Sequence, residues 1–196
     1  MRADAIVLGI AGILFGLIVG WVLGSQQAAR TAREAAPVAQ AAPASQQQQQ
    51  PPQAVPIDPA RAKALEDTAA QNPKDVQTRV QLGNMFFDAE QYPQAITWYE
   101  QALALNPNDT NVSTDLGVAF YYTNQADRAL KQFEHSLSID PKHIKTLLNV
   151  GIVRAFGKQD FAGAGRAWQQ VVDLAPDSPE GQAARKGLEG IKAAGK

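Results

Sequence analysis

The side chains that most often carry out chemistry in proteins are scarce in this chain. It has 196 residues, no cysteine and two histidines, His135 and His143. The sequence holds no glycine-rich phosphate loop, no paired-histidine metal motif and no nucleophile set beside a base. We expect both histidines to be surface residues, and the helical pattern places neither of them beside Ser113 or Ser136. The sequence therefore predicts a protein that is not an enzyme and that uses no cofactor and no metal ion.

The nearly equal numbers of basic and acidic residues bear on whether the chain binds nucleic acid. The chain has 18 Lys and Arg residues against 19 Asp and Glu residues, and its basic residues are scattered. A nucleic-acid-binding protein usually gathers basic residues into a patch or stripe, so we expect no nucleic acid partner. Without cysteine, a disulfide framework and a thiolate zinc site are excluded.

An apolar segment without charged residues occupies residues 5–24. As a helix, it would span about 30 Å, the thickness of a bilayer's hydrocarbon core, where backbone polar groups find no other partner. Glycines recur at every fourth position and share one helix face: Gly12, Gly16, Gly20 and Gly24. Such a face lets a second helix pack closely, so we predict contact with a second copy or another membrane protein. The alternative is that glycine is simply common in transmembrane helices.

The apolar segment is longer than the core of a signal peptide, which has about 7–15 residues. We therefore expect an uncleaved anchor helix, preceded by a short tail at residues 1–4. Basic residues on the two sides are nearly balanced, so the positive-inside rule leaves the orientation open. The short tail favours a signal-anchor that exports the rest of the chain. We expect a single-pass protein of a bacterial inner membrane with its soluble domain in the periplasm.

Residues 25–57 form a segment rich in Ala, Gln and Pro, with few charges and no large aromatic residue. Such a composition buries too little apolar surface to offset the entropy lost on folding. Its prolines favour extended stretches. We predict a linker that holds a folded domain away from the membrane.

The remainder of the chain repeats with a period of 34 residues. The recurring glycines are Gly83, Gly117 and Gly151, and the recurring prolines are Pro73, Pro107, Pro141 and Pro176. A small residue recurs at Ala95, Ala129 and Ala164, and an aromatic residue at Tyr99, Phe133 and Trp168. The glycines and alanines suit a close helix crossing, the aromatic residues fill the space between the helices, and each proline follows a helix end.

This pattern closely resembles the tetratricopeptide repeat family, whose unit is a 34-residue helix-turn-helix. The resemblance predicts an all-α solenoid, tethered to the membrane helix. It consists of three repeats at 76–109, 110–143 and 144–177, an N-terminal flanking helix at 58–73 and a C-terminal capping helix at 178–194. Two departures stand out. The third repeat has one extra residue, which we place in its inner turn near 156–161, and Arg79, Thr114 and Leu147 replace a large aromatic residue usual in the family.

The resemblance implies that the first helix of each repeat lines a concave groove that binds a protein partner. The matched groove positions are Asn84, Phe87, Val118, Tyr121, Tyr122, Lys145, Leu148 and Ile152. This mostly apolar and aromatic set suits an apolar peptide or an amphipathic helix. Phe87 and Tyr121 have an alternative role, packing between repeats. A subgroup of the family grips a carboxylate with basic and amide side chains, but here Asp115 stands among the matched positions and would repel it.

Together these features predict a membrane-anchored scaffold or adaptor for assembling or chaperoning complexes of the bacterial envelope. Its layout resembles that of anchored tetratricopeptide accessory subunits in cytochrome c maturation and in translocon-associated chaperone systems. Two alternatives stay open: a structural accessory subunit of a larger membrane complex, and a repeat protein that assembles into a homo-oligomer.

Overall fold

The computed structural model describes residues 55–194, apart from the side chain of Ala194. The described residues belong to one compact unit. The predicted tail, the anchor with its four glycines and nearly all of the linker lie outside the described residues. Within residues 55–194, no helix combines the length and the apolar character that crossing a bilayer requires.

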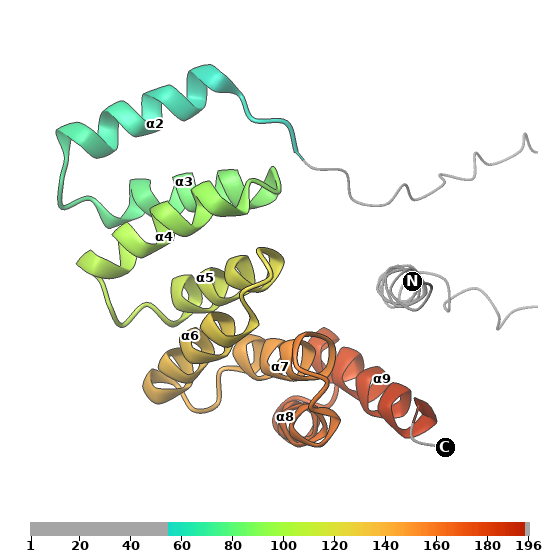
Figure 1. Cartoon of the computed structure of the whole chain (residues 1–196). Helices are drawn as coiled ribbons and strands as arrows, with labels where there is room; N and C mark the ends of the chain where they lie inside the picture. Colours follow the sequence, from blue (N-terminus) through green and yellow to red (C-terminus); the bar gives the residue numbers. More distant parts are fainter. Residues whose placement is uncertain (1–54, 195–196) are drawn as a thin grey trace, which may run out of the picture. The chain divides into compact units, whose positions relative to one another are not determined.

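The described residues form helices joined by short turns, with no strand among them (Figure 1). Eight α-helices and one π-helix follow one another along this part of the chain: α2 (Pro59–Gln71), α3 (Val76–Asp88), α4 (Tyr92–Leu105), α5 (Thr110–Tyr122), α6 (Ala126–Ile139), α7 (Ile144–Ile152), η1 (Val153–Gly157), α8 (Phe161–Leu174) and α9 (Pro179–Ala194). Figure 1 shows them stacked in chain order, from α2 at one end to α9 at the other. The prediction of an all-α helical-repeat fold is therefore confirmed for this part of the chain.

Helix pairs α3–α4, α5–α6 and α7–α8 pack closely because a glycine on the first helix meets an aromatic ring on the second. A Cβ atom built on Gly83 would lie 2.5 Å from Cδ1 of Tyr99, and one on Gly117 would lie 2.6 Å from Cδ1 of Phe133. The third repeat places Gly151 against Trp168 in the same way. No side chain fits at these crossings, so the recurring glycine sets the distance between paired helices.

Aspartate residues begin several of the helices. The carboxylate of Asp75 accepts a hydrogen bond from the backbone N–H of Thr78, and that of Asp109 accepts one from Val112. These bonds satisfy backbone donors that have no partner within the first turn of a helix. The start of each of these helices is therefore set by a residue next to it in the sequence.

The extra residue of the third repeat lies inside a helix, so its predicted placement in the turn is wrong. The chain turns at Glu90, Asn124 and Gln159, all with φ near 60°. Glu90 lies seven positions after Gly83, whereas Gln159 lies eight positions after Gly151. The difference is absorbed in η1, where the N–H of Lys158 bonds to the carbonyl oxygen of Val153, five residues earlier, at 3.1 Å. A bulge inside the helix keeps the turn and the following helix start unchanged.

Arg79 is a buried cation that stands where the family usually has an aromatic residue. Its side chain is 8% exposed, and its guanidinium donates hydrogen bonds to the backbone oxygens of Ala69, Asn72 and Asp75 at 3.2, 3.2 and 2.6 Å. These oxygens lie at and beyond the C-terminal end of α2, where carbonyl groups lack helical partners and a positive charge is favourable. The hydrogen bonds of Arg79 therefore hold the end of α2 against α3, the first helix of the first repeat.

A buried hydroxyl network joins α5, α6 and α7. Thr114 Oγ1 lies 2.6 Å from Thr146 Oγ1, which lies 2.7 Å from Nδ1 of His143. Thr114 also lies 3.5 Å from Ser136 Oγ, which donates to Ser113 Oγ at 2.8 Å. The four hydroxyl residues are buried, so their partners must come from within the protein. His143, which we expected on the surface and away from these serines, is half-buried and forms part of this network.

Candidate protein-binding face

The eight predicted groove residues lie on the first helices of the three repeats. Helix α3 carries Asn84 and Phe87, α5 carries Val118, Tyr121 and Tyr122, and α7 carries Lys145, Leu148 and Ile152. We call this set the groove face. Asn84, Tyr122 and Lys145 are exposed, and the other five are partly buried. The structure packs Phe87, Val118 and Tyr121 against the core of α2–α6, and Leu148 and Ile152 against the separate core of α7–α9.

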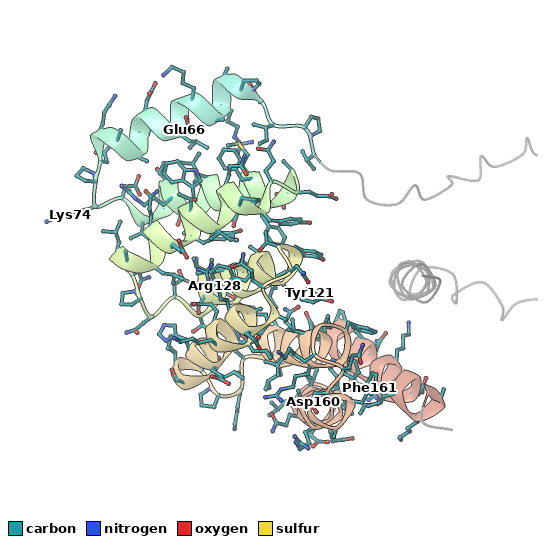
Figure 2. All side chains as sticks on the ribbon, in the orientation of Figure 1. Glu66, Lys74, Tyr121, Arg128, Asp160 and Phe161 are labelled. Atoms are coloured by element: carbon teal, nitrogen blue, oxygen red, sulfur yellow. The ribbon has the colours of Figure 1, made fainter. Side chains whose placement is uncertain are left out.

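An aromatic cluster forms where the first two repeats meet. The rings of Tyr92 and Tyr122 stack, with centroids 4.6 Å apart and planes 12° apart. Phe87 meets both rings edge-on, at 5.4 Å from Tyr92 and 6.1 Å from Tyr122. The ring centroid of Tyr121, a residue labelled in Figure 2, lies 5.9 Å from that of Tyr122. Three predicted groove residues are thus in one cluster, and Phe87 and Tyr121 also have the packing role that the sequence left as an alternative.

Tyr92 is a member of this cluster that the sequence reasoning missed. It is the first residue of α4, in the second helix of its repeat rather than the first. A sequence signal existed, because Tyr92 and Phe161 stand at the same place in repeats one and three, three residues before the recurring alanine. Only the contact with Tyr122, from the next repeat, shows what this aromatic residue does.

The aromatic cluster is an uncharged surface. Burial raises the pKa of the Tyr122 hydroxyl above its ordinary value, and the nearby Glu90 raises it further. The pKa of Tyr92 is also raised, by burial first and then by Tyr122. Both phenols therefore stay neutral at physiological pH. Tyr122 is 44% exposed, so part of its ring is open to a partner while its other contacts hold it in place.

The polar residues of the groove face are occupied by partners within the chain. The ammonium of Lys145 lies 2.7 Å from the carboxylate of Asp115, and Asn84 Oδ1 accepts a hydrogen bond from the Tyr99 hydroxyl at 2.8 Å. Asn149 Nδ2 donates to the backbone oxygen of Lys145 at 2.9 Å. Together with Val80, the residues Asn84, Asp115, Lys145 and Asn149 stand at the positions that the family resemblance matches to a carboxylate clamp. Their arrangement neutralises the one lysine among them and leaves the face mainly apolar.

Metal binding has no candidate group in this part of the chain. Among the described residues, no three His, Cys, Asp or Glu side chains come together in a way that could hold a metal ion.

Comparisons with known proteins agree with this architecture. Residues 83–124 match the family model described as "TPR repeat". No curated protein matches the sequence. Among solved structures, the crystal structure of MamA is similar with a TM-score of 0.57 and 15% identity, over 69% of this chain and 90% of that chain. The Sgt2 TPR domain from Aspergillus fumigatus is 26% identical with a TM-score of 0.55, over 61% of this chain and 78% of that one.

A third similar structure contains a bound peptide. It is the second TPR domain of the human RPAP3 protein in complex with the HSP70 peptide SGPTIEEVD, with a TM-score of 0.53 and 22% identity, over 58% of this chain and 92% of that chain. The fold and the family match together support a tetratricopeptide-repeat protein, a class of protein that generally serves as a non-catalytic interaction scaffold. The matches indicate no enzymatic family.

Proposed function

We propose that this chain is a membrane-anchored tetratricopeptide scaffold whose groove face binds an apolar peptide or an amphipathic helix of a protein partner. The observation that carries the proposal is the aromatic cluster with its exposed ring, Tyr122, held by Tyr92 and Phe87. Rigid aromatic side chains with part of their surface open are frequent anchors in protein interfaces. Leu148 and Ile152 extend the apolar character of the set along α7.

The electrostatics of the groove face favour an apolar partner over an acidic chain terminus. The second TPR domain of RPAP3 is in complex with a peptide that carries two glutamates and a terminal aspartate. In this chain Asp115 neutralises Lys145, the one lysine of the groove face, and a carboxylate ligand would also meet the charge of Asp115 itself. Like charges placed against each other across an interface are unfavourable.

The proposed cellular setting rests on the sequence outside the described residues. Residues 5–24 serve as the transmembrane anchor of a bacterial inner-membrane protein, and residues 25–57 act as the spacer. Gly12, Gly16, Gly20 and Gly24 provide the packing face of the anchor, against a second copy or another membrane protein. The repeat domain then works in the periplasm, in the assembly or chaperoning of envelope complexes.

The proposal is tested by capturing partners on the full-length chain and on a Tyr122→Ala, Ile152→Ala variant. Removing both side chains takes away apolar contact area, so the captured protein should be lost or bound at least about tenfold more weakly, which corresponds to about 1.4 kcal/mol. The control is Leu105→Ala with Ile139→Ala, which likewise removes two apolar side chains outside the groove face, both of them exposed, at 40% and 36%. Capture that survives in the groove variant as in the control would contradict binding on this face.

A further inference from the structure

A recessed surface lies between the outer helices of the first two repeats, apart from the groove face. This α4–α6 cleft has a volume of about 540 Å³. Its apolar floor is formed by Leu103 of α4 and by Leu116 and Phe120 of α5. Its rim carries Glu100 from α4 and three residues of α6: Arg128, Lys131 and His135. Figure 2 labels Arg128 at this place.

The cleft is separate from the groove face. The two surfaces share no residue. On α5, Leu116 and Phe120 are four positions apart and lie on one side, whereas Val118 and Tyr122 lie on about the opposite side, because each residue turns the helix by about 100°. The two surfaces can therefore be occupied independently.

The rim of the cleft has an excess of positive charge. The guanidinium of Arg128 lies 3.9 Å from the centre of the Phe120 ring and donates a hydrogen bond to Glu100 Oε1 at 3.1 Å. The negative charge of Glu100 is thereby balanced by one cation. Lys131 is exposed and has no hydrogen-bond or ion-pair partner among residues 55–194. His135 Nε2 lies 2.9 Å from the carbonyl oxygen of Pro107, so this nitrogen carries a proton and donates.

We propose that the α4–α6 cleft binds a segment of a protein partner in which an apolar side chain stands next to an Asp or Glu. The apolar side chain rests on Leu103, Leu116 and Phe120, and the carboxylate faces the ammonium of Lys131. Charge complementarity selects this occupant, because the unpaired cation stands directly beside apolar surface. A nucleic acid would instead bring a row of phosphates against Glu100 and cover the apolar floor with charge.

The test is a selection of random peptides displayed against the immobilised full-length chain. We expect the enriched peptides to carry Asp or Glu beside Leu, Ile or Phe, and their binding to weaken as salt is added, because the contact with Lys131 is exposed. A synthetic copy of an enriched peptide should bind the Lys131→Glu variant about tenfold more weakly, since an attraction becomes a repulsion. Lys131 is exposed, so this variant should melt at the same temperature as the wild type.

Two control variants make the selection decisive. Lys74→Glu makes the same change of charge at another exposed lysine, in the α2–α3 turn and outside the cleft, and should leave peptide binding unchanged (Figure 2). Tyr122→Ala with Ile152→Ala should also leave it unchanged, which separates this inference from the proposed function of the groove face. The inference is wrong if no acidic–apolar peptide is enriched, if the enriched peptides bind Lys131→Glu as tightly as the wild type, or if the groove variant abolishes their binding.

Discussion

At the scale of single residues, the closeness of the helix pairs depends on positions where no side chain fits. Tyr99 and Phe133 are 1% and 0% exposed, so neither ring has room to move away from the glycine it covers. Arg79 is a second position where the residue type matters. Its guanidinium donates hydrogen bonds to three backbone oxygens, which an aromatic ring could not do. The glycine crossings and the Arg79 hydrogen bonds both depend on atoms about 3 Å apart. Adding or removing a single chemical group at these positions therefore changes the packing or the hydrogen bonding.

We predict that Gly117→Ala lowers the free energy of unfolding by about 1–2 kcal/mol. The new methyl group would lie 2.6 Å from Cδ1 of Phe133, and such overpacking costs about 1–3 kcal/mol, of which alanine's higher helix propensity returns up to about 1 kcal/mol. Denaturant titration measures the change. Gly190→Ala is the matched control, because a Cβ there meets nothing within 4 Å, and it should raise the stability slightly. Equal effects of the two substitutions would refute the packing argument.

At the scale of elements, the junction of η1 with α8 shows how a repeat absorbs an inserted residue. Arg154 of η1 contributes an ion pair of 2.7 Å to Asp160, whose carboxylate also accepts the N–H of Gly163 at 2.8 Å at the start of α8. The two contacts tie the irregular end of one helix to the beginning of the next. The hydrogen bond from Gly163, followed by the one from Arg154, holds the pKa of Asp160 below its ordinary value of 3.8.

A lowered pKa makes the contribution of Asp160 to stability dependent on pH. Near pH 4 the unfolded chain binds more protons at this residue than the folded chain, so the contribution is complete above the unfolded pKa and disappears as the pH falls through the folded one. Asp160→Asn keeps a helix-capping side chain but cannot ionise. We predict that the wild type is more stable than this variant at pH 7 and that the difference shrinks as the pH falls below the ordinary aspartate pKa of 3.8.

Unfolding followed by circular dichroism across this pH range tests the prediction. Arg154→Gln is the informative second variant, because it removes the ion pair with Asp160 and leaves the hydrogen bond from Gly163. It should therefore keep part of the pH dependence. A stability difference between Asp160→Asn and the wild type that does not change with pH would contradict the assignment.

At the scale of the whole molecule, the described array has two adjoining hydrophobic cores rather than one. The first extends from α2 to α6 and includes Val153 of η1, and the second is formed by α7, α8 and α9 with Ala155 of η1. The hydroxyl network around Thr114 and Thr146 connects the repeats on either side of this boundary. Because the groove face extends from α3 to α7, a partner that bound all of it would contact both parts of the array.

The proposed membrane setting makes a prediction about the whole chain. A reporter that is active only outside the cytoplasm, fused after Lys196, should give signal, and a reporter that is active only in the cytoplasm should not. Deleting residues 5–24 should reverse this result, because the short tail and apolar segment act together as the export signal. Signal from the cytoplasmic reporter on the intact chain would overturn the periplasmic placement.

Much of the fold was predictable because each repeat encodes its helices locally. Aspartates at the helix starts, the recurring Gly83 and Gly117, and prolines after the helix ends act through neighbours within a few positions or within one repeat. The candidate groove residues came from the resemblance to the tetratricopeptide family, mapped onto the same repeat positions. The stacking of Tyr92 on Tyr122 could not be predicted in this way. The two rings belong to different repeats, and a local sequence pattern does not give the distance between repeats.

The amino-acid order alone was enough to predict three helix pairs and two flanking helices within residues 58–194, because the 34-residue recurrence of glycine, alanine, aromatic and proline residues resembles the tetratricopeptide repeat. The folded arrangement was needed to learn that the extra residue forms a π-helix, that His143 joins a buried network and that Lys131 stands unpaired above an apolar floor. These outcomes depend on distances between helices of different repeats. Such distances are set by the packing of side chains from several repeats at once. They therefore cannot be predicted from the sequence of one repeat.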